Sequence, residues 1–174
     1  YSKYGYLACA QVLSSYGASR RVVIKNKGGS DVDNVALDAG HTDTAAWLTL
    51  SRQWSTPLHH LDIIDATRAR SLLRDGASLN AHVAAGGDRG PTPLSLARQL
   101  RAEGRAPNGS PAALVLTAAE PWSVKTHALF PAAARARALE MLLIGFRLSR
   151  EDPYEKVGQG LLDLWVGNVM PRLV

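Results

Sequence analysis

Apolar residues recur at helical spacing in the middle of the chain, between residues suited to start and stop a helix. Thr56 can cap a helix with its hydroxyl, and Pro57 suits the first helical position because its φ is already fixed. Gly76 can adopt the left-handed conformation that closes a helix. The apolar residues on one face of the helix before it are Ala66, Ala69, Leu72 and Leu73. Residues 56 to 81 therefore predict two helices joined by a turn, a unit that buries its apolar face only against neighbours.

Similar segments precede this unit. Residues 7 to 13 predict one apolar helix that Gly17 closes, and residues 31 to 53 predict a helix with an aspartate cap, a turn at Gly40-His41 and a second helix over 44 to 48. Residues 20 to 30 lie between these segments. They predict a loop or a short β-hairpin around Val22-Val23-Ile24.

A further unit follows. Thr92 and Pro93 restart the pattern, with a first helix to about Glu103, a polar turn, and a second helix over 110 to 119. The long loop over 81 to 91 before it contains several glycines, but no buried strand precedes them and no Lys-Ser/Thr follows, so a phosphate-binding loop is not expected. The chain thus predicts a row of helix pairs separated by loops.

The central unit resembles the ankyrin repeat. That resemblance rests on Thr56-Pro57-Leu58-His59, then Leu72-Leu73, then Gly76-Ala77, and it is repeated in Thr92-Pro93-Leu94, where Ser95 takes the place of the histidine. From Thr56 to Leu72 there are sixteen residues, one fewer than the family's usual spacing of about seventeen, and the missing residue falls in the turn between the helices.

The resemblance covers residues 7 to 119 and implies an all-α ankyrin-repeat solenoid of about three and a half helix-turn-helix units with finger loops. Its units are a partial one over 1–19 and then 31–53, 54–81 and 90–119, so 1–119 forms the repeat stack. The resemblance also implies that His59 hydrogen-bonds between neighbouring units, as the family's histidine does.

Residues 120 to 174 leave the repeat pattern. One predicted helix begins after Pro131, and a last one runs from about Leu161 to Met170 and ends at Pro171. We expect this helical extension to cap the last repeat, because an uncovered end would be an apolar patch. A cap of this kind should bury, against 110 to 119, the residues Leu139, Leu142, Leu143, Phe146, Leu161, Leu164 and Trp165.

Composition narrows the location. The chain has 174 residues with 46% hydrophobic and 20% charged, and no apolar run reaches the roughly 18 residues that span a bilayer. Cys9 is the single cysteine, so no internal disulfide is possible, and its apolar neighbours predict a buried, inert thiol. An intracellular location, cytoplasmic or nuclear, is the default. An organellar one stays open because the chain begins at Tyr1, and a targeting segment could precede it.

The net charge of +5 is concentrated at the N-terminus, because residues 1 to 30 contain five basic side chains and no acidic one. The sequence leaves two interpretations: a solvated loop, or a contact for a protein partner with an acidic surface. Nucleic-acid binding is not expected, since the charges form no stripe along the predicted repeat helices.

No catalytic, cofactor or metal site is predicted. His59 and His60 are adjacent on a predicted helix and diverge by about 100°, so they cannot easily share a metal. Asp31 and Asp33 lack the remaining spacing of a calcium loop. Serine, histidine and aspartate occur without a nucleophile elbow. An enzyme is therefore not expected.

The ankyrin resemblance instead implies a non-catalytic scaffold that binds proteins through finger tips and a concave face. The candidate contacts are Arg20, Arg21, Lys25, Lys27, Trp54, His82, Asp88 and Arg89. For Trp54 a core position is an equal alternative, whereas Trp47, Trp122 and Trp165 are expected to pack inside.

Two other functions stay open. Residues 123 to 128 are loosely similar to the opening of a SOCS box, the helical box that ubiquitin-ligase substrate receptors carry after ankyrin stacks, although Ala128 replaces its cysteine. The chain could also be a linker subunit of a large, possibly organellar, complex. An uncovered apolar stripe in 121–174 would favour an element that recruits a second protein. A fully buried stripe would favour a structural cap.

Overall fold

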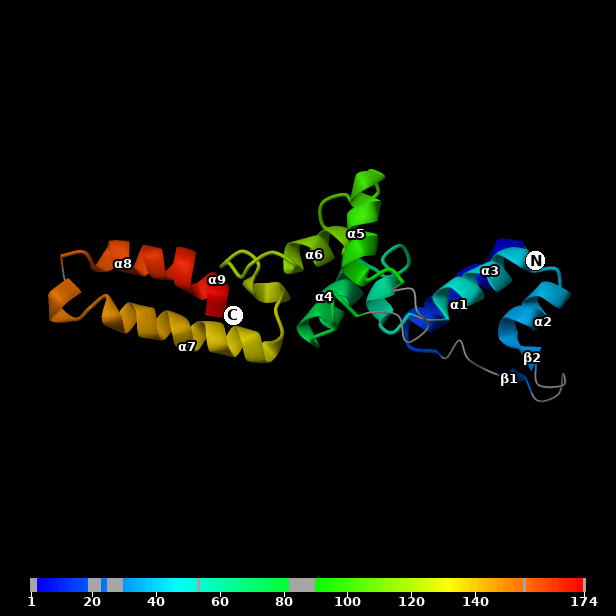
Figure 1. The fold of residues 1–174 in the computed structure, drawn as a ribbon, viewed down its shortest axis with the longest axis horizontal. Helices are drawn as coiled ribbons and strands as arrows, with labels where there is room; N and C mark the ends of the chain where they lie inside the picture. Colours follow the sequence, from blue (N-terminus) through cyan, green and yellow to red (C-terminus); the bar gives the residue numbers. More distant parts are fainter. Residues whose placement is uncertain are drawn as a thin grey trace.

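The computed structural model describes residues 3–18, 23–24, 30–52, 54–81, 90–154 and 156–173, and Figure 1 shows an elongated arrangement of helices. Helices α1 to α3 lie at one end, α4 to α6 in the middle and α7 to α9 at the other end (Figure 1). The predicted all-α class is confirmed for these residues, one pair of two-residue strands aside.

The elements in chain order are α1 (Lys3–Ser15), β1 (Val23–Ile24), β2 (Ser30–Asp31), α2 (Val32–Asp38), α3 (Thr42–Ser51), the 3-10 helix η2 (Pro57–His59), α4 (Ala66–Arg74), α5 (Pro93–Ala102), α6 (Pro111–Ala118), η3 (His127–Leu129), α7 (Ala132–Leu148), η4 (Asp152–Tyr154), α8 (Gly158–Leu164), the π-helix η5 (Trp165–Val169) and α9 (Met170–Leu173).

The predicted helix pairs on either side of the centre are confirmed. The pair α2 and α3 fills residues 31–53. Asp33 at the start of α2 accepts hydrogen bonds from Thr49 near the end of α3 and from Arg52, which follows α3. The pair α5 and α6 fills residues 90–119, and Thr92 and Ser95 cap α5 reciprocally. The β-hairpin alternative for residues 20–30 is also confirmed as far as the structure describes them, since Val23 pairs with Asp31 and Ile24 with Ser30.

The central unit departs from expectation in its first helix. Thr56 accepts a hydrogen bond from the Leu58 amide and Pro57 follows it, as predicted, but the helix is only the single 3-10 turn η2. Residues 61–64 then form a turn, and α4 begins after the cap Asp65. The prediction of a full first helix is wrong. The unit is one residue shorter than the usual repeat between Thr56 and Leu72, which is consistent with the short helical turn. The second helix ends as predicted, with Gly76 at φ +82°.

The main hydrophobic core lies between the two units of residues 54–119. Helix α4 packs on α6, and η2 packs on α5. The predicted motif residues Leu58, Leu72 and Leu73 are buried here, Pro93 is buried as well, and Ala77 and Leu94 are half-buried beside the core. The Leu94 amide donates to the Leu79 carbonyl, which joins the unit ends on either side of the long loop.

The N-terminal helices join this core through α1, which packs on α3 and on η2. Buried Ser14 and Ser15 belong to the side of α1 that is covered. Cys9 lies on the exposed side, so the predicted buried thiol is wrong. A single helix with two neighbours can bury only part of its circumference, and the sequence of α1 is apolar on more than that part.

The C-terminal helices form an arm with its own small core. Helix α7 packs on α8, η5 and α9, and a cluster of Trp122, Ala138 and Met170 is buried there. The arm joins the main core through η3, whose Leu129 belongs to that core, and the Arg74 side chain donates to the Ala128 carbonyl. The arm therefore contacts α4 and the main core through the segment before α7.

The predicted burial of the arm's apolar residues is wrong for four of seven. Exposed fractions are 55% for Leu139, 57% for Leu143, 45% for Phe146 and 61% for Leu164. Leu142, Leu161 and Trp165 are half-buried. The arm has two helical layers only, so α8, η5 and α9 cover one face of α7, and no described helix packs on the other, where the Arg150 guanidinium lies 4.8 Å from the centroid of the Phe146 ring.

The last helix also differs from expectation. It begins at Gly158, widens to a π-turn over η5, where the Met170 amide donates to the Trp165 carbonyl, and continues past Pro171 to Leu173. Proline has no N–H to donate to residue 167 and its ring would clash there, so a wider turn accommodates it within the helix rather than ending it.

Candidate functional site

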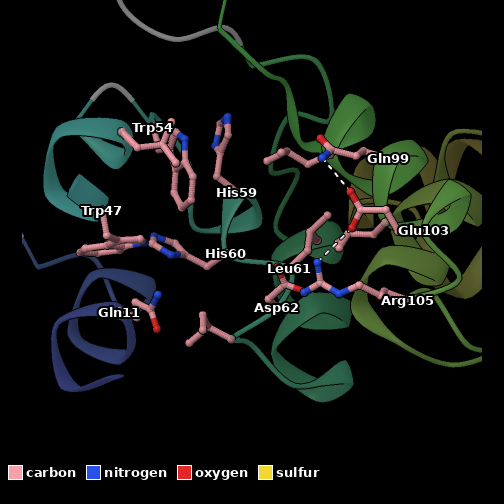
Figure 2. A pocket seen from close by; sticks show the side chains of 14 residues that line it. Gln11, Trp47, Trp54, His59, His60, Leu61, Asp62, Gln99, Glu103 and Arg105 are labelled. Atoms are coloured by element: carbon pink, nitrogen blue, oxygen red, sulfur yellow. Dashed lines mark hydrogen bonds and ion pairs between the residues drawn. The ribbon is translucent and has the colours of Figure 1, made fainter. Parts of the chain in front are cut away.

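A groove of about 270 Å³ opens beside η2, between α3 and α5 (Figure 2). Its lining residues are Gln11, Trp47, Leu50, Trp54, His59, His60, Leu61, Asp62, Ile63, Leu96, Gln99, Leu100, Glu103 and Arg105. The single turn of η2 occupies less space here than the predicted helix would. The groove therefore lies where the central unit departs from its predicted form.

One wall of the groove is aromatic. The Trp54 ring stacks on His59 with centroids 5.7 Å apart and meets His60 edge-on at 4.9 Å. Trp47 contacts Trp54 edge-on at 6.4 Å and lies 5.9 Å from His60. Figure 2 shows these four rings gathered on one side of the groove. Interlocked rings of this kind make a rigid apolar wall.

The two histidines of this wall are buried and hydrogen-bonded. Nδ1 of His59 lies 3.0 Å from the Thr56 carbonyl oxygen, and Nε2 lies 3.1 Å from the Pro91 carbonyl oxygen. A neutral ring donates to one of these oxygens and a protonated ring to both. His60 bonds through Nε2 to the Ser14 hydroxyl at 3.2 Å. His59 thus bridges residue 56 to the start of the next unit, as the sequence resemblance implied.

The opposite wall carries a chain of charged and polar side chains (Figure 2). Arg105 donates to Asp62 at 2.8 Å and to Glu103 at 3.0 Å, and Gln99 donates to Glu103 at 2.8 Å. The Gln99 hydrogen bond and then Arg105 lower the pKa of the Glu103 carboxyl, and Glu103 with Asp62 raises that of Arg105. All three ionised groups are exposed and together carry one net negative charge.

The hydrogen bonds along this polar wall lead to a testable prediction about the pKa of Glu103. Gln99→Ala removes the largest cause of the lowered pKa, so the Glu103 pKa should rise toward its ordinary value while staying below it, since Arg105 remains. ¹³C-detected NMR titration of the Glu103 carboxyl measures the shift. Because Gln99 is exposed, the circular dichroism spectrum of the variant should match that of the unaltered chain, which is the control for folding. An unchanged Glu103 pKa would mean that the Gln99 bond is not formed in solution.

Most of the predicted contact residues lie outside the described residues. Arg20, Arg21, Lys25 and Lys27 in the first loop and His82, Asp88 and Arg89 in the second fall there, so their role stays a prediction. Trp54 is described. It is half-buried among aromatic rings and also lines the groove, so both alternatives for it hold in part.

Sequence reasoning missed the polar rim. Asp62 follows the single helical turn, and Glu103 and Arg105 flank Gly104 at the end of α5, 43 residues away. Two short polar segments at such a separation give no local pattern that pairs them. The only sequence signal was that both are turns after a Thr-Pro-Leu start, which places them at equivalent ends of neighbouring units.

No three histidine, cysteine, aspartate or glutamate side chains in the part of the chain that the structure describes gather in a way that could hold a metal ion. No helix among the same residues is long and apolar enough to cross a membrane.

Comparison of the chain with protein-family models, with curated proteins and with solved structures gave no match. The geometry of the groove and of the C-terminal arm is therefore the basis for the functional conclusions.

Proposed function

We propose that the chain is a non-catalytic, ankyrin-type scaffold that binds a protein partner in the groove beside η2. The observation that carries this proposal is the groove itself, which combines a rigid aromatic wall with a polar rim of one net negative charge. Apolar depressions with a few oriented polar groups are typical of binding sites. Its volume suits one or two side chains of a partner rather than a large cofactor.

The repeat assignment is supported by local features. The helix α4 packs on α6 and η2 on α5, so like elements of the two units are neighbours, as stacked repeats require. His59 joins the two units, in the role that the resemblance gives it. A stack of this kind offers a preformed surface, and a partner pays little ordering entropy on the repeat side.

The partner segment should present an apolar side chain with a basic residue next to it. The apolar residue would enter between Trp47, Leu50 and Leu96, and the basic one would meet the rim at Asp62. An acidic region on the same partner could face the basic N-terminal loop, as the charge distribution predicts.

Site-specific photo-crosslinking tests this proposal. A photoreactive amino acid at Gln99, on the groove rim, should give a discrete adduct with a protein in extract from the native source. The same group at Arg70, an exposed residue of α4 that does not line the groove, is the positional control and should not. Adducts from position 70 alone, or equal labelling from both positions, would contradict a groove-centred scaffold.

A pair of substitutions sharpens the result. Leu50→Glu adds a charge to the groove at a residue that is already exposed, so folding should be retained and the adduct from position 99 should fall at least about tenfold. Leu37→Glu makes the same change at an exposed leucine outside the groove and should leave the adduct unchanged. Equal effects of the two variants would assign the loss to general surface charge.

A second candidate function is favoured by the C-terminal arm. Its uncovered apolar residues are what a recruiting element would show, whether the chain is a SOCS-box-like substrate receptor or a linker subunit of a larger complex. Recovery of a cullin adaptor with the intact chain, lost on Leu143→Lys, would support the receptor. Stable association with an assembly lacking ligase components would support the linker.

A further inference from the structure

The exposed face of α7 carries an apolar stripe. Leu139, Leu143 and Phe146 are spaced at i, i+4 and i+7, so they point in nearly one direction from the helix. All three are about half exposed or more, in an arm whose own core is small. Exposed large apolar side chains in line on one helix mark an interaction surface.

The two flanks of this stripe differ. On one side lies Leu142, which packs against the arm's buried cluster with Trp165, so that flank is covered by the chain itself. On the other side lie Glu140 and Arg147, seven residues apart and therefore nearly aligned. Both are exposed, and neither has an ion-pair partner among the residues that the structure describes.

We propose that this stripe binds the α7 stripe of a second copy of the chain, with the two helices antiparallel. Antiparallel helices related by a two-fold axis bring the same flank of each together, so the open flank of one copy faces the open flank of the other. A parallel pair would set the open flank of one helix against the Leu142 flank of the other, which the arm already covers.

Charge complementarity fixes the register. A pairing centred between Leu143 and Ile144 places Glu140 of each copy opposite Arg147 of the other. This gives two equivalent ion pairs, each between a carboxylate of one copy and a guanidinium of the other. It also places the two copies of Leu143 next to each other at the centre of the contact. The alternation of a negative and a positive group on one flank is therefore self-complementary only in the antiparallel arrangement.

The same flank argues against a membrane as the occupant. An amphipathic helix that lies on an anionic bilayer carries basic residues along its polar border. Here Glu140 stands beside Leu139 on the flank that it shares with Arg147, so this border carries a negative as well as a positive charge. One helix per copy buries less than the roughly 1,600 Å² of a standard interface, so a micromolar dissociation constant is expected.

Analytical ultracentrifugation of the full chain, from about 1 to 200 µM, tests the proposal. The expected result is concentration-dependent growth from the 18.7 kDa of one chain to twice that mass. Leu143→Lys should abolish it, with the circular dichroism spectrum and melting temperature retained because Leu143 is exposed. Leu37→Lys makes the same change at a leucine of matched exposure, 56%, and should associate like the unaltered chain.

Charge reversal tests the register. Glu140→Arg should raise the dissociation constant about tenfold, since two attractions become repulsions, and adding Arg147→Glu should restore it. A monomer at every concentration, an unaffected Leu143→Lys variant, or a double reversal without rescue would each overturn the proposal. So would a monomer that sediments with vesicles of phosphatidylcholine and phosphatidylserine. The groove crosslinking uses other residues, so the two proposals can fail separately.

Discussion

Replacing His59 with alanine is expected to lower the free energy of unfolding by about 3 kcal/mol. The side chain is buried, and its ring nitrogens lie within hydrogen-bond distance of the Thr56 and Pro91 carbonyls. Alanine leaves both carbonyls without this partner and removes the ring on which Trp54 stacks. The Thr56 carbonyl keeps the backbone amide of residue 59 as a donor, so the loss combines one unpaired carbonyl, that of Pro91, with a cavity.

Urea unfolding of the unaltered chain and of His59→Ala measures this difference. Val124→Ala, at an exposed position outside both units, is the control and should change stability by less than about 0.5 kcal/mol. Because His59 bridges two units, hydrogen exchange should also accelerate in α5, which Pro91 precedes, and stay unchanged in α7. A loss below about 1 kcal/mol would show that the bridge contributes little in solution.

The repeat-like middle of the chain was readable because its signals are local. Thr92 and Pro93 start α5, and Gly76 closes α4, through backbone conformations that those residue types favour wherever they occur. The same local signals at Thr56 and Pro57 gave only one helical turn. Nothing in the start of a helix fixes its length. The length of the helix depends on packing against α5 and α1, and no local sequence pattern predicts that packing.

The groove could not be predicted for the same reason. It exists because η2 is short and because Asp62 and Arg105 meet across two units. Each of these residues is unremarkable in its own segment, a polar side chain in a turn. Trp54 was the one groove residue that the sequence proposed as a partner contact, because a large aromatic side chain beside a repeat start is informative whether it binds or packs.

In the C-terminal arm, the apolar stripe predicted a helix but not the surface that the helix packs against. The spacing of Leu139, Leu142, Leu143 and Phe146 at i, i+3, i+4 and i+7 predicts one face of a helix, and α7 has that face. The spacing does not say which surface covers it. The sequence argument assigned the last repeat, whereas the face of α7 that packs within the chain is the one with Ala138, Leu142 and Gly145. Small residues marked the true contact.

Gly145→Ala is expected to destabilise the arm by about 2 kcal/mol, despite alanine's higher helix propensity. A Cβ at this position would lie 2.5 Å from Cδ1 of Trp165 and 2.7 Å from Nε1. The indole cannot move away freely, since its Nε1 donates to the Met141 carbonyl at 3.0 Å and the ring contacts the arm's buried cluster. Either the hydrogen bond is lost or α7 and η5 separate.

Gly160→Ala supplies a control of opposite sign. It lies in α8, within the same arm, and a Cβ there meets nothing within 4 Å. This variant should be stabilised by up to about 1 kcal/mol, because alanine restricts the unfolded chain and favours the helix. Urea unfolding of both variants decides the matter: if Gly145→Ala is as stable as Gly160→Ala, the close contact between α7 and Trp165 does not exist. The stripe of α7 would then not be held on the outside of a fixed arm, and the antiparallel pairing would lose its geometric basis.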